Sequence, residues 1–156
     1  MSLSATREGI ATAINTAITA NGYSAEIIEW PNQRIASQPV DSRWWRVVIQ
    51  TGTTNPITIG GVGQRRTRTP FVVIIQIFLP ENGGTKEAYE IADKLGKGTS
   101  GLDYQRTAPI TDATLTPNQI VYLNWETVGI TFVGSTNGSS QFNISISGRS
   151  DAQDVP

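Results

Sequence analysis

Cysteine and histidine are both absent from the 156 residues of this chain. Without cysteine there is no disulfide and no thiolate nucleophile, and without histidine there is no imidazole general base. The usual zinc ligands are missing as well, and a serine nucleophile would have no histidine to activate it. We therefore expect a protein that is not an enzyme and that needs no metal or cofactor.

The chain also lacks a strong excess of either charge and a long apolar run. Twelve Lys and Arg residues stand against thirteen Asp and Glu residues, so there is no overall attraction to nucleic acid or to an anionic membrane. The longest apolar run, Phe71 to Leu79, has the length of a strand and falls far short of the ~20 residues that span a bilayer. Polar residues interrupt the N-terminal segment, so no secretory signal is predicted. We expect a soluble protein with no membrane partner.

Two segments have the apolar spacing of a helix that packs on one side. The first runs from Ser4 to Asn21, and the second begins at Thr85 and extends to Leu95. Their predicted buried residues are Ile10, Ile14 and Ile18 in the first, and Ala88, Ile91, Ala92 and Leu95 in the second. The pair Asn21-Gly22 is expected to end the first helix.

The rest of the chain contains short stretches of β-forming residues separated by turn residues. The predicted strands are Tyr23 to Trp30, Trp44 to Thr51, Phe71 to Leu79, Ile120 to Trp125, Thr127 to Val133 and Gln141 to Ser147. Asn137-Gly138 predicts a hairpin between the last two strands. In the final strand Phe142, Ile144 and Ile146 are expected to face inward, whereas Phe71 to Leu79 is apolar on both faces and predicts a strand covered on both sides.

The order of these elements predicts an α+β fold with a mainly antiparallel β-sheet, two helices packed on one side and a long hairpin arm. The arm is predicted between Gly52 and Pro70, a segment rich in Gly, Thr and Arg that could otherwise be a mobile loop. Residues 1–148 are expected to form a single domain. Residues 149–156 show no apolar pattern and are expected to be a flexible C-terminal tail.

Adjacent tryptophans and a group of arginines are the candidate contact residues. Trp44 and Trp45 must point to opposite faces of a strand, so one of them either lies under a loop or helix or anchors a protein interface. Arg65, Arg66 and Arg68 form the basic cluster, with Arg43 and Arg46 expected nearby. These arginines are interpreted as a solvated loop, as contacts to a neighbouring subunit, or as contacts to DNA.

Other patterns indicate chemistry only weakly. Gly60, Gly61 and Gly63, followed by Gln64, are typical of a flexible hairpin tip, and the phosphate-loop alternative lacks the required Lys-Ser/Thr pair. Glu87 and Glu90 are neighbours on a predicted helix face of the kind found on a solvated surface. Neither pattern predicts a catalytic residue.

The arrangement of these segments resembles the tail terminator, or tail completion, proteins of long-tailed bacteriophages. The resemblance covers nearly the whole chain and rests on element order more than on single residues. It is carried by the N-terminal helix, Glu29-Trp30-Pro31-Asn32, the strand-loop-strand unit Trp44 to Leu79, Pro80-Glu81-Asn82-Gly83-Gly84 before the second helix, and the strand pair after Gly129.

The resemblance implies a structural virion protein that acts by geometry and has no catalytic residue. It implies a homo-oligomeric ring, commonly of six copies, that sits on the end of the tail tube, stops tube polymerisation and offers a surface for head attachment. The expected partners are therefore the chain itself, the tail-tube protein and head-tail connector proteins, with DNA in the channel as a passing contact. The expected location is the virion tail, and the host cytoplasm during assembly.

The predicted interface consists of the Gly52 to Pro70 arm and the edges of the sheet. Its candidate residues are Trp44, Trp45, Arg46, Gln64, Arg65, Arg66 and Arg68. Two other functions remain open at this point. One is a head-tail joining (neck) protein, and the other is a small nucleic-acid-binding module that uses the Arg65, Arg66 and Arg68 loop.

Overall fold

A computed structural model describes residues 3–37, 39, 42–58, 65–80, 85–96, 102, 110–112, 119–136 and 138–154. It contains two helices, α1 (Leu3–Ala20) and α2 (Lys86–Gly96). Its strands are β1 (Ile27–Glu29), β2 (Trp44–Thr51), β3 (Asn55–Pro56), β4 (Arg66–Pro80), β5 (Ile110–Asp112), β6 (Gln119–Thr136) and β7 (Ser139–Asp154). Several residues named in the sequence analysis lie outside the described residues, among them Gly60, Gly61, Gly63, Gln64 and Asn137.

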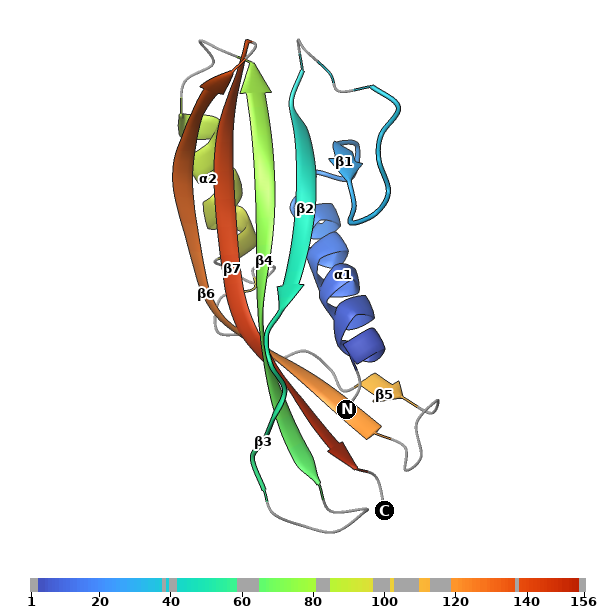
Figure 1. Cartoon of the computed structure of the whole chain (residues 1–156). Coiled ribbons are helices and arrows are strands. Elements are labelled where there is room, and N and C mark those ends of the chain that lie inside the picture. The colour runs from blue at the N-terminus through green and yellow to red at the C-terminus, as the bar shows by residue number, and fades with distance from the viewer. Residues whose placement is uncertain are drawn as a thin grey trace.

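The described strands form one sheet in the order β1-β2-β4-β7-β6-β5, with β3 beside β4. Every pair of neighbouring strands is antiparallel except β1 and β2. Both helices lie on the same face of the sheet (Figure 1). The predicted α+β fold with a mainly antiparallel sheet is confirmed.

The helices form where the apolar spacing predicts them. Ile10, Ile14 and Ile18 of α1 are buried, as are Ala88, Ile91, Ala92 and Leu95 of α2. The end of α1 has the hydrogen bonds of a Schellman motif, because the Tyr23 N–H donates to the Ile18 carbonyl (3.0 Å) and the Gly22 N–H to the Thr19 carbonyl (3.1 Å). Gly22 has a φ of 85°, which glycine adopts at little cost.

The core lies between the helices and the sheet face that they cover. On β7, Phe142, Ile144 and Ile146 are buried in this core, as predicted. The two strands predicted before them are a single long strand, β6, which is interrupted by a bulge between Trp125 and Thr127. The bulge changes which side chains face inward, so the alternation on either side of it looked like two strands.

The expected flexible tail is wrong for residues 149–154. β7 continues through Asp154 and pairs with Arg66–Pro70 of β4 on one side and with 119–124 of β6 on the other. Its inward positions are small or polar residues, and Ser150, Ala152 and Asp154 are all buried. This segment has no hydrophobic alternation because its inner face is filled by small side chains and hydrogen bonds, among them Thr6 Oγ1 to Ser150 Oγ at 2.7 Å.

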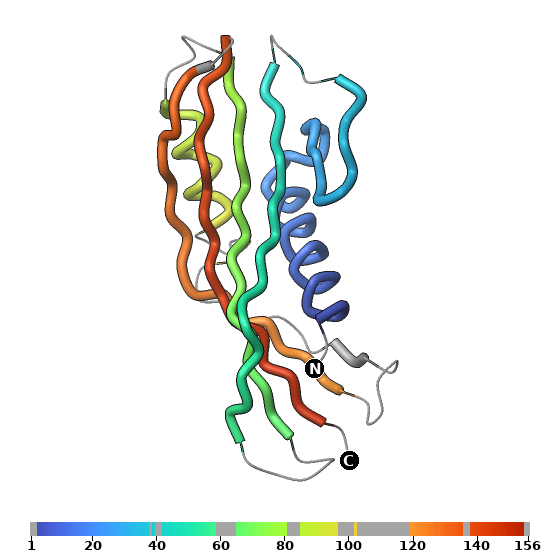
Figure 2. Tube along the Cα trace, viewed as in Figure 1, coloured from blue at the N-terminus to red at the C-terminus, as the bar shows by residue number. Residues whose placement is uncertain are grey.

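The C-terminal part of the predicted arm between Gly52 and Pro70 belongs to the sheet and not to a projecting hairpin. β3 and the start of β4 do form a hairpin, with Asn55 opposite Arg68. However, β4 begins at Arg66, so the last part of this segment is a full member of the sheet that pairs with β7. Figure 2 shows β4, β7 and β6 twisting together beyond the end of α1.

Candidate interaction surface

Trp44 and Trp45 lie on opposite faces of β2, and both are buried. Trp45 is 0% exposed and belongs to the core under the helices. Trp44 is on the outer face, which neither of the described helices covers, yet it is only 4% exposed. Its ring stacks on Phe78, the directly opposite residue of β4, with ring centres 4.1 Å apart. Of the two alternatives for the outward-facing tryptophan, the structure shows a covered side chain, and the cover includes the ring of Phe78 on the neighbouring strand.

Arg46 lies beside this stack, between its strand partners Glu29 on β1 and Gln76 on β4. Its guanidinium carbon is 5.3 Å from the Trp44 ring centre and 5.6 Å from that of Phe78. Arg46 Nε donates to Glu29 Oε1 on β1 at 2.9 Å, and Nη1 reaches Gln76 Oε1 on β4 at 3.5 Å. These contacts hold the guanidinium over the aromatic rings, a cation–π arrangement that restricts its orientation.

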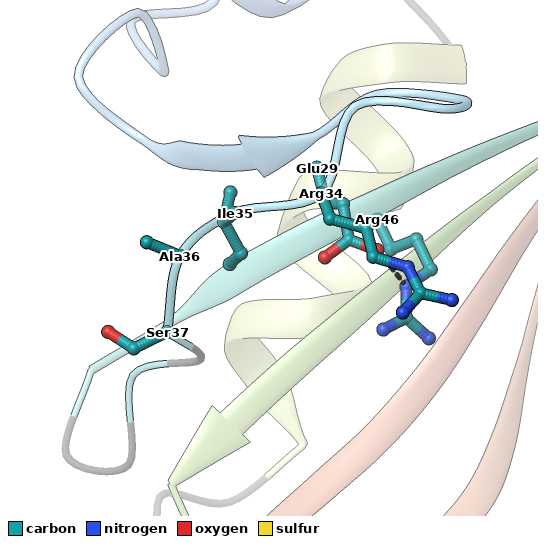
Figure 3. A pocket seen from close by; sticks show the side chains of 6 residues that line it. All are labelled: Glu29, Arg34, Ile35, Ala36, Ser37 and Arg46. Atoms are coloured by element: carbon teal, nitrogen blue, oxygen red, sulfur yellow. Dashed lines mark hydrogen bonds and ion pairs between the residues drawn. The ribbon is translucent and has the colours of Figure 1, made fainter.

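A groove of about 680 Å³ opens beside Arg46. Its lining residues are Glu29, Arg34, Ile35, Ala36, Ser37 and Arg46, from the β1–β2 connection and the two strands (Figure 3). The guanidinium groups of Arg34 and Arg46 turn toward the same side of the groove, and no ion pair joins Arg34 to a described carboxylate. With two arginines and one glutamate, the groove has a net positive lining.

Arg65, Arg66 and Arg68 lie together around the start of β4, but Arg46, which was expected nearby, lies far from them along the sheet. Arg68 is paired with Asp151, its direct partner on β7, through Nε to Oδ1 at 2.7 Å and Nη2 to Oδ2 at 3.1 Å. The hydrogen bonds to Asp151 raise the pKa of the Arg68 guanidinium above its ordinary value. Arg46 is opposite Gln76, eight positions along β4 from Arg68, which corresponds to about 26 Å of strand.

The remaining arginines are also divided. Arg43 bonds to both Glu26 and Glu87 and lies over the Tyr23 ring, and burial lowers the pKa of its guanidinium. Arg65 and Arg66 are exposed at the start of β4, and no ion pair joins either of them to a described carboxylate. Only these two of the predicted arginines therefore keep their charge available.

The outer face of the sheet is apolar in its centre. Val48 on β2 and Val72, Ile74 and Phe78 on β4 all point away from the helices, and we call these four residues the outer stripe. Val72 is 36% exposed and the other three are partly buried. On the neighbouring strand β7 the outer residues Asn143, Ser145 and Ser147 are polar. No second layer of described residues covers the stripe.

Several residues of this surface were not singled out from the sequence. Arg34, Gln76 and Asp151 were not among the candidate residues, and Glu29 was named only as part of the segment Glu29-Trp30-Pro31-Asn32. Asp151 lies 83 positions from Arg68, so no local spacing could indicate the pair.

The described residues contain no group of three acidic side chains placed to hold a metal ion. Within the same ranges, neither helix combines the length and apolar content needed to cross a bilayer. Comparisons with protein-family models and with curated proteins found no match, so the surface itself has to support any functional proposal.

Proposed function

We propose that this chain is a structural protein of a bacteriophage tail. It forms a ring on the end of the tail tube, stops tube polymerisation and provides a surface for head attachment. In this proposal the protein belongs to the virion tail and assembles in the host cytoplasm, and its partners are other copies of itself, the tail-tube protein and head-tail connector proteins.

The observation that supports an assembly role best is the outer stripe. β4 is apolar on both faces, as expected of a strand covered on both sides, yet the described helices cover only one of them. Val72 and its neighbours would bury apolar surface if another protein packed against them, which is favourable by roughly 25 cal/mol per Å². A ring of identical subunits offers such a partner, because one patch of each copy meets a different patch of the next.

The basic residues fit this role better than they fit nucleic-acid binding. Arg68, Arg46 and Arg43 are already bonded to carboxylates of the same chain. A carboxylate at hydrogen-bonding distance competes with phosphate for the same donors, so these three arginines are poor phosphate ligands. Arg65 and Arg66 alone would provide a small basic patch near the β3–β4 hairpin, which suits a contact with a neighbour or a passing contact with DNA.

The proposal is tested by polymerising the cognate tail-tube protein with and without this chain and measuring tube lengths by negative-stain electron microscopy. We expect short tubes with a cap at one end when the chain is present. Tubes of unchanged length with bare ends would count against the terminator role and would bring the head-tail joining alternative forward.

A pair of variants shows whether the outer stripe is the contact. Val72→Glu places a charge in the stripe, and we expect it to abolish capping. Thr16→Glu adds the same charge at an exposed position on α1 and should cap normally. Both variants should show the circular dichroism spectrum and melting temperature of the wild type, because both sites are on the surface.

A further inference from the structure

One edge of the sheet is open along β2. The Gly52 N–H donates to the Pro70 carbonyl at 2.8 Å, directly opposite it in the register that pairs Thr51 with Phe71. In an antiparallel pair, residues alternate between bonding to the partner strand and pointing away from it. Because Gly52 bonds to β4, the N–H and C=O groups of Thr51 and Ile49 point to the opposite side.

The neighbour on that side is too short to reach these groups. β1 pairs only with Trp44–Arg46 of β2. The chain then turns sharply, with the Gln33 N–H donating to the Trp30 carbonyl at 3.0 Å and Asn32 at a φ of 62°. β4 pairs with Ile49 and Thr51 on one side, and no strand among the described residues pairs with them on the other. An open strand edge of this kind is a template for another extended chain.

A groove of about 430 Å³ lies along this edge, between β2, the turn after β1 and helix α1. α1 runs beside β2 below β1, which places the helix along the side of the groove (Figure 1). The groove offers apolar contacts from Ile49, Trp30 and Ala11 and polar contacts from Asn15 and Gln33. Among the described residues that line it, Arg7 alone is charged.

We propose that this groove binds an extended segment of another protein, which adds to the sheet as a strand beside β2. The segment hydrogen-bonds to the backbone of Ile49 and Thr51, and its alternate side chains face the groove. One of these side chains is apolar and packs against Trp30 and Ile49. Another is acidic and pairs with Arg7, since none of the described residues that line the groove is a carboxylate.

This inference goes beyond the proposed tail function and does not depend on it. The outer stripe is on a face of the sheet, whereas this groove is at an edge, so the two surfaces can be tested separately.

The probe is a displayed library of random linear peptides of about twelve residues, selected on the wild-type chain. The discriminating variant is Ile49→Pro, which removes an N–H that points into the groove and costs no hydrogen bond to β4. Ile49→Val is its matched control, because it trims the same side chain and keeps the N–H. We expect selected peptides to bind the wild type and Ile49→Val equally and Ile49→Pro at least about tenfold more weakly.

Two further results are expected of the selected peptides. Their sequences should place an acidic residue an even number of positions from an apolar one, and Arg7→Gln should weaken their binding several-fold. Amide resonances of Ile49, Thr51 and the α1 residues of the groove should shift when a peptide is added. If Ile49→Pro fails to fold, Thr51→Pro, at an exposed position with the same outward N–H, takes its place.

Two outcomes would overturn the proposal. In the first, no peptide is selected, or the selected peptides bind wild type and Ile49→Pro equally. In the second, the wild-type chain self-associates and Ile49→Pro abolishes that self-association, which would make a second copy the occupant of the edge. Neither measurement uses the tail-tube protein, so failure here leaves the capping experiment unaffected.

Discussion

The indole ring of Trp44 lies nearly parallel to the phenyl ring of Phe78, with ring centres 4.1 Å apart and an interplanar angle of 8°. The two residues are direct partners on β2 and β4, and the Arg46 guanidinium lies over both rings. Trp44 is almost completely buried, although it lies on the sheet face that neither described helix covers. This large aromatic side chain is therefore buried within the single chain and stabilises its fold; it is not exposed for contact with another protein.

Replacing Trp44 with alanine should lower the free energy of unfolding by about 3 kcal/mol, because the stack and most of the buried aromatic surface are lost. Urea unfolding followed by far-ultraviolet circular dichroism measures the change. Trp44→Phe keeps a ring over Phe78 and should lose less than half as much. A Trp44→Ala chain as stable as the wild type but unable to assemble would show instead that Trp44 is a partner anchor.

Arg68 and Arg66 are two positions apart on β4 and face the same way, but they should respond differently to substitution. Arg68→Gln breaks the two hydrogen bonds to Asp151 and should lower stability measurably, although by less than about 1 kcal/mol because the pair is partly exposed to solvent. Arg66→Gln should leave stability unchanged, since no described carboxylate pairs with it.

Salt provides a second readout of the same pair. Raising the ionic strength should reduce the stability difference between the wild type and Arg68→Gln, because a partly exposed ion pair is screened. If Arg66→Gln proves the more destabilising of the two, the contacts assigned to Arg68 do not describe the protein in solution. The thermal unfolding midpoint at low and high salt decides between these outcomes.

Gly148 lets two aromatic side chains meet across β7. It pairs with Phe71 on one side and Trp125 on the other, and these two rings pack edge to face with centres 5.0 Å apart. A Cβ atom at Gly148 would lie 2.6 Å from the Asn124 carbonyl oxygen and 2.6 Å from Phe71 Cζ. Neither neighbour can move easily, because one is backbone and the other is a buried ring.

Gly148→Ala should therefore destabilise the fold by about 1–3 kcal/mol, the usual cost of overpacking a core. Gly129→Ala on β6 is the control, because a Cβ there meets nothing within 4 Å. That change should be neutral or stabilising by up to about 1 kcal/mol, since alanine restricts the unfolded chain. Differential scanning calorimetry of both variants tests the contrast, and equal melting temperatures would contradict it.

Periodicity was enough to find the elements whose buried faces are apolar. The isoleucines of α1, the Ala-Ile-Ala-Leu stripe of α2 and Phe142, Ile144 and Ile146 of β7 lie where the pattern placed them. It failed where the inner face is small or polar, as at Ser150, because such residues have no hydrophobic alternation to detect.

The contacts of the candidate surface were harder to predict because they join distant parts of the chain. The alternation of a strand predicts that Trp44 faces away from Trp45. It does not predict that Phe78 stacks on Trp44, because local sequence does not show which residues of two strands are paired. The open edge at Ile49 likewise depends on where β1 stops and on the alternation of hydrogen bonds, neither of which composition or spacing reveals.

The C-terminal part of β7 should be essential for folding. A chain ending at Gly148 loses the strand between β4 and β6 along Arg66–Pro70 and 119–124, and with it the buried side chains of Ser150 and Ala152. Backbone groups on both neighbouring strands then lack partners. We expect a loss of about 5 kcal/mol or more, comparable to the whole stability of a small domain, so this chain should be unfolded or aggregated.

A chain ending at Asp154 keeps all the described residues of β7 and should melt like the full-length protein. Proton-nitrogen correlation spectra of the two truncated chains provide the measurement. A dispersed, native spectrum from the chain ending at Gly148 would mean that residues 149–154 are the dispensable tail that their composition suggests.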